Sequence, residues 1–280
     1  MWVPFLPFCF QLRVKGDGME ELQVSQLDGV RLITLNRPER LNALHEALAE
    51  ELVKTLDEAS RDDQVRVVVV IGTGRGFCAG LDLTSHTFEE RGQRSRFERL
   101  DPLGFVGRQA LAVTACDKPV IAAINGIAAG AGLALALACD LRYMADDATL
   151  TTGYIRRGLS PDAGVTYFLP RLCGMTDATE LIMTGRTVTA NEANGLRIVN
   201  RVFARATFQE DVMKIAHELA AGPPLALTQS KRLLAGTYDH SLADQLKLEW
   251  TAIHECFASE DVREGVRSFL EKRPPQFTGN

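Results

Sequence analysis

The sequence predicts an α/β fold with a mostly parallel sheet, followed by a helical C-terminal region. Val65–Ile71 and Pro119–Ile124 are apolar runs typical of strands covered on both faces, and Leu141–Met144 reads as a third short strand. Strand and helix patterns alternate along this part of the chain, which favours crossover connections within a parallel sheet. From Phe208 onward the periodicity is helical and predicts no further strand.

A hairpin and a long helix are expected at the start of the domain. Leu22–Leu27 and Val30–Leu35 are β-rich runs, and the Asp28-Gly29 dipeptide between them is a strong signal for a two-residue turn. Ala43 to Ala59 then carries apolar residues at helical spacing. The polar stretch from Thr87 to Arg99 indicates a mobile or helical segment.

The later helices follow from composition and from stop signals. A helix of small residues, Ala131 to Cys139, is expected after Asn125-Gly126. The C-terminal helices are expected at Phe208–Ala221, Pro224–Ala235, Leu242–Phe257, and from a cap at Asp261 to about Glu271, where Arg273-Pro274-Pro275 ends the last one. These patterns divide the chain into an N-terminal extension (1–18), a core in which the functional site is expected (19–205) and a helical C-terminal region (206–280).

Composition excludes several classes of function. The chain has 280 residues, 46% of them hydrophobic, which is enough for a full core without disulfides or metals. The net charge of −5 argues against a general nucleic-acid or membrane-surface binder. The apolar run at residues 1–10 is too short to span a bilayer. The six cysteines are scattered and show no metal spacing, so we expect reduced thiols in a cytoplasmic protein that binds no metal.

Two glycine-rich turns that follow buried strands are the segments best suited to chemistry. The first, Gly72 to Asp82, has four glycines in nine residues; the second, Asn125 to Gly132, leads into a helix that must begin near Gly130. The first N–H groups of a helix lack partners within it, and helix N-termini carry partial positive charge. Either turn alone is common in tight strand-to-helix packing. Together they predict two converging N–H donors, as an enolate or thioester oxyanion requires.

Several separate segments resemble the crotonase (enoyl-CoA hydratase/isomerase) superfamily. They are Leu35–Pro38, Leu41–Leu44, Gly76–Asp82, Asn125–Asp140, Arg263–Gly265 and Phe269–Arg273. The resemblance covers about residues 20–280 and implies a spiral of ββα units with a C-terminal helical region that builds homotrimers or hexamers. It also implies an acyl-coenzyme A thioester substrate, with no cofactor other than the coenzyme A of that substrate.

The resemblance assigns roles to particular positions. It places the two oxyanion donors at the backbone N–H groups of Leu81 and Ala131. Arg40 falls in the loop that wraps the adenine of coenzyme A, and Phe269 and Lys272 fall where the family reaches coenzyme A, often from a neighbouring subunit. A solvated lysine at a helix end is the alternative for Lys272. The implied substrate contacts are Arg40, Ala79, Gly80, Gly130, Tyr154, Phe269 and Lys272.

The proton-transfer group is the point at which this sequence departs from the family's hydratases. Hydratases use two glutamates to hold a water, and the matching positions here are Ala134 and Tyr154, which cannot take a proton from water. Asp162 stands nearby, within Gly158–Gly164, a segment that resembles the Δ3,Δ2-enoyl-CoA isomerases and the isomerase of phenylacetate degradation; Pro275–Gly279 resembles the latter too. One carboxylate suffices to remove a proton from one carbon and return it at another, so an isomerase is favoured.

Other interpretations remain open. The chain could be a hydratase with relocated acid–base groups, or a catalytically silent protein that holds acyl-CoA. Gly130-Ala131-Gly132 alone half-matches the fingerprint of a Rossmann-type oxidoreductase. Asp162 also suits a helix N-cap, Tyr154 suits core packing, and Asp82 and Asp140 are expected to be structural anchors.

Overall fold

The computed structural model describes residues 20–84 and 95–280 and contains two sheets. One has the strand order β1-β2-β3-β5-β7-β10 and the other β4-β6-β8-β9, and all neighbouring pairs are parallel except β1·β2 and β8·β9. The strands are β1 (Leu22–Leu27), β2 (Val30–Leu35), β3 (Val67–Gly72), β4 (Gly76–Cys78), β5 (Val120–Ile124), β6 (Ile127–Ala129), β7 (Leu141–Ala145), β8 (Thr149–Thr151), β9 (Val188–Thr189) and β10 (Arg201–Phe203). The predicted α/β fold with a mostly parallel sheet is confirmed. The extension at 1–18 and most of the stretch from Thr87 to Arg99 lie outside the described residues.

A repeated step along the chain builds both sheets. Each of β3, β5 and β7 in the larger sheet is followed by a strand of the smaller sheet, β4, β6 and β8, and the order of strands is the same in both sheets. Helices follow each pair, namely α3 (Gly104–Ala115), α4 (Ala131–Ala138) and α5 (Val165–Thr184). This is the spiral of ββα units that the resemblance implied. The smaller sheet was not predicted from residue patterns, because strands of two or three residues carry no readable periodicity.

The N-terminal hairpin forms as predicted. β1 and β2 pair in antiparallel register from Leu22–Leu35 to Leu27–Val30. Asp28 and Gly29 both have positive φ, 46° and 80°, as the tight turn between two twisted strands requires.

Two helices beside the sheet differ from the sequence predictions. α1 spans Glu46–Arg61 and begins later than Ala43, because His45 is its N-cap and accepts the N–H of Leu48 at 3.3 Å. α3 was not predicted, although Val106, Gln109, Ala110 and Val113 form one buried face at helical spacing. A short helix, α2 (Arg96–Leu100), precedes α3.

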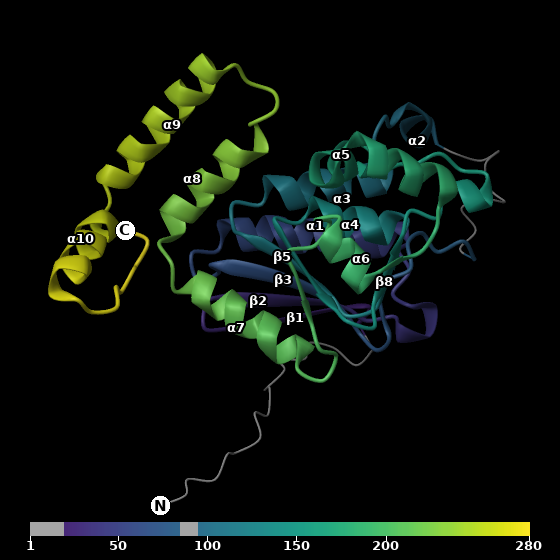
Figure 1. Cartoon of the computed structure of the whole chain (residues 1–280), viewed down its shortest axis with the longest axis horizontal. Helices are drawn as coiled ribbons and strands as arrows, with labels where there is room; N and C mark the ends of the chain where they lie inside the picture. The colour runs from purple at the N-terminus through teal and green to yellow at the C-terminus, as the bar shows by residue number, and fades with distance from the viewer. Residues whose placement is uncertain (1–19, 85–94) are drawn as a thin grey trace, which may run out of the picture.

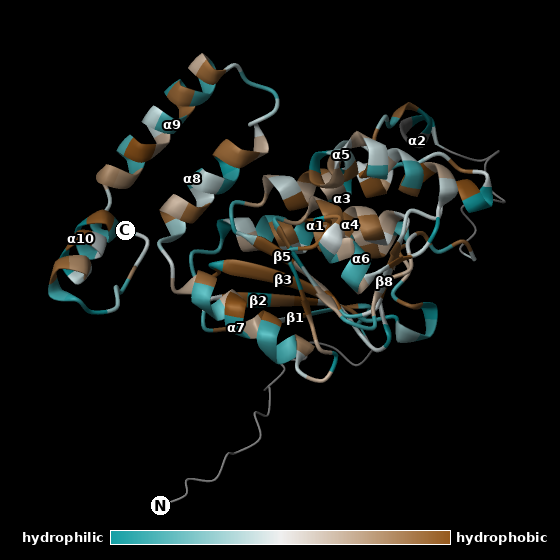
Figure 2. Cartoon of the chain, in the orientation of Figure 1, coloured by the Kyte–Doolittle hydropathy of each residue, from teal (hydrophilic) through white to brown (hydrophobic). Residues whose placement is uncertain are grey.

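Helices cover the larger sheet on both sides. α7 (Phe208–Ala220) contacts β2, β3, β5 and β7. On the other side, α1 contacts β1 and α4 contacts β5. Figure 1 shows α7 crossing the strands while α1, α3 and α4 gather on the opposite side. The strands between them are hydrophobic along most of their length, as the brown ribbons of β2, β3 and β5 indicate (Figure 2). The chain therefore buries both faces of its parallel strands.

The last three helices form an arm beside this body. α8 (Pro224–Ala235), α9 (Leu242–Phe257) and α10 (Glu260–Glu271) lie to one side of the sheets (Figure 1), and α8 has no buried residue. The short α6 (Ala190–Gly195) lies earlier, between β9 and β10. None of the described helices is both long and apolar enough to cross a membrane.

The start of α10 corrects one prediction. Ser259, not Asp261, is the N-cap, and its Oγ accepts the N–H of Val262 at 3.3 Å. The carboxylate of Asp261 instead accepts the N–H groups of Thr278 and Gly279, at 2.7 and 3.0 Å. A buried carboxylate held by two backbone donors of the C-terminal segment is not free to cap its own helix.

Candidate active site

Two buried asparagines fix the first glycine-rich turn, between β3 and β4. Asn42 Nδ2 donates to the carbonyls of Thr73 and Gly76, at 3.0 and 2.8 Å. Asn125, which belongs to the second turn, accepts the N–H of Gly72 at 3.0 Å and donates to its carbonyl at 2.7 Å. These hydrogen bonds hold the two turns side by side.

The second turn brings α4 into close contact with the first. Gly130, the N-cap of α4, has a φ of 52°, a left-handed value that favours glycine. Gly132 packs so tightly that an added Cβ would lie 2.2 Å from the carbonyl oxygen of Cys78. An added Cβ on Gly80 would lie 2.7 Å from the Ala129 oxygen and 3.4 Å from the Ala131 nitrogen. The glycines therefore place the N-terminus of α4 directly against residues 78–81.

The backbone N–H groups of Leu81 and Ala131 lie at this contact. Leu44 N–H donates to Gly80 O at 2.7 Å, and Asp82 N–H donates to Leu44 O at 2.8 Å. Because successive N–H groups of an extended chain alternate in direction, the N–H of Leu81 faces away from Leu44. Ala131 is the first residue of α4, so its N–H has no acceptor within the helix. Within the described residues, neither N–H is bonded to a backbone carbonyl.

A cavity of about 660 Å³ opens beside these two N–H groups. This size is within the usual range for small-molecule sites. The apolar part of its wall includes Leu83, Leu103, Phe105, Val106 and Leu159. The remaining wall comes from the two turns (79–81 and 129–131), from residues 152–154, from Arg157, Ser160 and Asp162, from Ser95, Asp101, Gly104 and Arg108, and from Glu46 and Glu50 of α1.

Tyr154 and Asp162 form a hydrogen-bonded pair on this wall. The Tyr154 hydroxyl donates to Asp162 Oδ1 at 2.8 Å, and the Tyr154 side chain is buried. Burial and the negative charge of Asp162 raise the pKa of Tyr154, so its hydroxyl stays protonated and acts as the donor. Core packing was the alternative for Tyr154, and its side chain is both buried and part of the cavity wall. A helix N-cap was the alternative for Asp162, but the N-cap of α5 is Gly164, and no side chain caps this helix.

The structure brings together some of the residues singled out in the sequence and leaves others apart. Leu81, Ala131, Ala79, Gly80, Gly130, Tyr154 and Asp162 all line the cavity. Arg40, Phe269 and Lys272 do not: Arg40 is exposed in the 3₁₀ turn η1 (Pro38–Arg40), Phe269 is 83% exposed, and Lys272 is the C-cap of α10.

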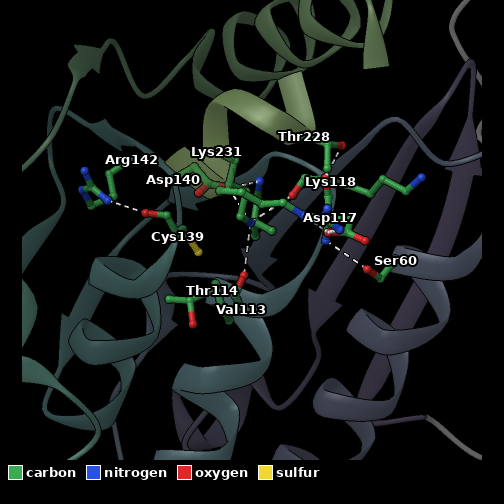
Figure 3. A network of polar contacts seen from close by, with 12 residues as sticks. Ser60, Val113, Thr114, Asp117, Lys118, Cys139, Asp140, Arg142, Thr228 and Lys231 are labelled. Atoms are coloured by element: carbon green, nitrogen blue, oxygen red, sulfur yellow. Dashed lines mark hydrogen bonds and ion pairs between the residues drawn. The ribbon is translucent and has the colours of Figure 1, made fainter. Parts of the chain in front are cut away.

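Asp82 and Asp140 have the structural roles expected of them. Asp82 Oδ2 pairs with Arg37 at 3.0 Å. Burial of Asp82 opposes its ionisation, but hydrogen bonds from Thr84 and Arg37 outweigh it and lower the pKa to about 2. Asp140 Oδ2 accepts the N–H of Val120 at 2.7 Å and pairs with Lys231 at 2.8 Å (Figure 3).

The sequence reading missed the charged residues on the α1 and α3 side of the cavity. Glu46, Glu50, Asp101 and Arg108 come from three segments whose proximity depends on tertiary packing of α1 against α3. The buried face of α3 was the available signal. Recognising that face would have placed Arg108 one turn into a helix, four residues after Gly104.

The described cysteines lie in surroundings that disfavour the thiolate form. The described cysteines are free, and burial raises the pKa of Cys78 and of Cys139 to about 12. In the part of the chain that the structure describes, no group of three or more His, Cys, Asp or Glu side chains could hold a metal ion.

Known proteins resemble this chain in both sequence and fold. The model of the enoyl-CoA hydratase/isomerase family matches residues 25–280. The chain is 36% identical to the 1,2-epoxyphenylacetyl-CoA isomerase of Escherichia coli K12, over 93% of this chain and 100% of that protein. It is also 36% identical to the 2,3-dehydroadipyl-CoA hydratase of the same strain, again over 93% and 100%. The crystal structure of a putative enoyl-CoA hydratase from Streptomyces coelicolor A3(2) superposes with a TM-score of 0.88 at 36% identity, covering 99% of this chain and 100% of that one.

The fold and the sequence matches are those of an enzyme family that acts on coenzyme A thioesters. The chain belongs to the enoyl-CoA hydratase/isomerase family, and its two sheets and C-terminal helices form the crotonase fold.

Proposed function

We propose that this enzyme is an enoyl-CoA isomerase, in which Asp162 moves a proton between two carbons of the acyl group. The thioester oxygen accepts hydrogen bonds from the N–H groups of Leu81 and Ala131. Asp162 removes a proton from the carbon next to the carbonyl, and the negative charge of the dienolate rests on that oxygen. The proton then returns at the far end of the conjugated system, which shifts the double bond by one position.

One observation supports this proposal: Asp162 lines the same cavity as Leu81 and Ala131, and within the described residues it forms no ion pair with a cationic side chain. The other acidic residues that line the described cavity, Glu46, Glu50 and Asp101, all lie within 4 Å of Arg108. Asp162 is held by the neutral hydroxyl of Tyr154. The Tyr154 hydroxyl can orient this carboxylate without placing a positive charge beside it.

The residues at the two hydratase positions support an isomerase over a hydratase. Ala134 is fully buried in α4 and does not line the cavity, and Tyr154 faces the cavity with a protonated hydroxyl. Neither can hold and deprotonate a water. The Escherichia coli relative whose name describes an isomerase is consistent with this choice.

The same proposal extends to the parts of the substrate outside the cavity. Arg40, Phe269 and Lys272 are exposed or lie at a helix end, where they remain candidates for the nucleotide part of coenzyme A. Apolar residues line one face of α9, where Leu242, Leu246, Trp250, Ile253 and Phe257 are all exposed. We propose that this face is covered in a homotrimer or hexamer, which would also bring Phe269 of one copy toward its neighbour.

An absorbance assay tests the reaction. The purified protein is supplied with 3-hexenoyl-CoA and, separately, with 2-hexenoyl-CoA, and the conjugated thioester absorbance is followed. An isomerase raises the absorbance with the first substrate. Asp162→Asn is expected to lower kcat by about 10²- to 10⁴-fold with little change in KM, because it removes the base and keeps the hydrogen bond from Tyr154.

Two further variants sharpen the result. Tyr154→Phe should lower kcat by about 3- to 30-fold, since the carboxylate loses the donor that orients it. Asp63→Asn, a substitution at an exposed position outside the cavity, serves as the matched control. A fall in absorbance with 2-hexenoyl-CoA and no rise with the 3-enoyl substrate would identify a hydratase. Full isomerisation by Asp162→Asn would refute the assigned base.

A further inference from the structure

One wall of the cavity carries a cluster of charges that the proposed reaction does not use. Arg108 of α3 donates to Asp101, and its Nη2 lies 3.6 Å from Glu46 and 3.9 Å from Glu50. Glu46 and Glu50 are one turn apart on α1, so both face the same neighbour. Each of the four side chains lines the cavity.

The ion pairs leave this wall negative. Three carboxylates surround one guanidinium, which gives a formal charge of 1 − 3 = −2. Among all charged side chains that line the described cavity, Asp162 and Arg157 add one charge of each sign, so the cavity as a whole also carries −2. The N–H of Leu103 donates to Asp101 at 3.0 Å and helps to keep the pKa of Asp101 low, so this carboxylate stays ionised beside Arg108 at neutral pH.

The charged wall could either attract or repel a carboxylate at the end of the acyl group. An arginine in an acyl pocket could bind the terminal carboxylate of a diacid, because guanidinium and carboxylate pair well. Here both terminal nitrogens of Arg108 already face carboxylates, and a further anion would have to compete with three of them. At separations of 5–10 Å in a partly solvated site, each surplus negative charge raises the energy of an added carboxylate by enough to change affinity several-fold. Repulsion therefore outweighs attraction.

We infer that the cavity selects uncharged acyl groups and rejects acyl groups that end in a carboxylate. This inference rests on the proposed role of the cavity in holding the acyl group, and it names the substrate class within that role. It sets this chain apart from a relative at the same level of identity whose name, 2,3-dehydroadipyl-CoA hydratase, describes a diacid thioester.

Binding of unreactive thioesters tests the inference independently of the chemistry. Hexanoyl-CoA and adipoyl-CoA have the same chain length and differ by one terminal carboxylate. Calorimetric titration at low salt should give a Kd for adipoyl-CoA at least about tenfold higher than for hexanoyl-CoA. The ratio of the two dissociation constants, Kd for adipoyl-CoA divided by Kd for hexanoyl-CoA, should shrink as salt is added, because partly exposed charges are screened.

Two variants should move this ratio in opposite directions. The double variant Glu46→Gln/Glu50→Gln makes the wall neutral and should reduce the ratio by threefold or more. Arg108→Gln leaves three uncompensated carboxylates and should increase it. Glu58→Gln, on the same helix but paired with Lys54 outside the cavity, should leave the ratio unchanged. Thermal melting of each variant checks that it is folded.

The outcomes separate this inference from the proposed reaction. Equal affinities in the unmodified protein, or tighter binding of adipoyl-CoA that Arg108→Gln abolishes, would overturn the inference even if the enzyme isomerises 3-hexenoyl-CoA. A large ratio that responds to the variants as described supports the inference even if the assay identifies a hydratase. Failure to bind either thioester would overturn both.

Discussion

Among single residues, Arg37 and Asp82 show how the first glycine-rich turn is anchored. Their ion pair is largely buried, with side-chain exposures of 12% and 7%, and Arg37 also donates to the carbonyl of Ala43 at 2.6 Å. Asp82 follows Leu81 directly, so this pair fixes the backbone that carries the first proposed oxyanion donor. The burial of the Asp82 carboxylate is thereby explained by its structural contacts, without any role in proton transfer.

Asp82→Asn is expected to destabilise the fold by about 1–3 kcal/mol at neutral pH, because it removes the more buried of the two carboxylates that pair with Arg37, the other being Glu21 at 2.9 Å. The folded-state pKa of Asp82 is about 2, below its ordinary value of 3.8. Its contribution to stability is therefore present above pH 4 and is lost as the pH falls through 2. Urea denaturation at pH 7 and pH 3 should show a smaller difference between variant and parent at the lower pH. An equal difference at both values would contradict this account.

Among elements, the contact between α4 and the first turn decides where the two proposed oxyanion donors lie. Gly132 permits α4 to approach Cys78 without the overlap that any side chain would cause. The second donor, Ala131, is the residue before it. The separation of the two N–H groups is thus set by glycine packing between one helix and one short strand.

Gly132→Ala should displace α4 from β4 and lower both stability and activity. The added methyl group would overlap the Cys78 carbonyl, at a cost of about 1–3 kcal/mol. Activity should fall by tenfold or more, because a shift of about 1 Å misplaces an oxyanion donor. Gly195→Ala in α6 is the matched control: a Cβ there meets open space, so we expect a change within about 1 kcal/mol and full activity. Equal losses in the two variants would refute this packing argument.

Local patterns were enough to predict some of these elements and not others. The hairpin and strands β3 and β5 could be predicted from the sequence, because turn residues and apolar runs are local signals. The smaller sheet and α3 were not, since their stability comes from packing against elements distant in sequence. In the site, the glycine pattern indicated both turns. The hydrogen bond between Tyr154 and Asp162 could not be predicted from the sequence, because it depends on a 3₁₀ turn and on Gly158, whose positive φ folds the chain back between the two residues. The Arg108 cluster needed three segments to meet.

In the whole molecule, a buried lysine helps to attach the C-terminal arm to the rest of the chain. Lys231 of α8 is 9% exposed, pairs with Asp140 at 2.8 Å, and donates to the carbonyls of Val113 and Lys118 at 3.2 and 3.1 Å. Figure 3 shows this amine inserted between the end of α3 and the start of β7. Since α8 buries no apolar residue in the described chain, polar contacts carry much of its attachment.

Lys231→Met should destabilise the protein by about 2–3 kcal/mol, because two carbonyls and a carboxylate lose their shared donor. The neighbouring Arg232→Met removes an exposed ion pair with Asp117 and should cost less than about 1 kcal/mol. Urea denaturation of the two variants side by side measures the difference. Equal stabilities would mean that the contacts of Lys231 stabilise the protein no more than an exposed ion pair does.

The two amide hydrogens at positions 81 and 131 belong to the main chain, which has a practical consequence for redesign. Libraries that replace Leu81 and Ala131 by other residues can reshape the wall of the acyl pocket and leave both donors in place. Proline is the exception, since it has no amide hydrogen. Substitutions at these two positions can therefore vary the wall of the cavity while both proposed donors are kept.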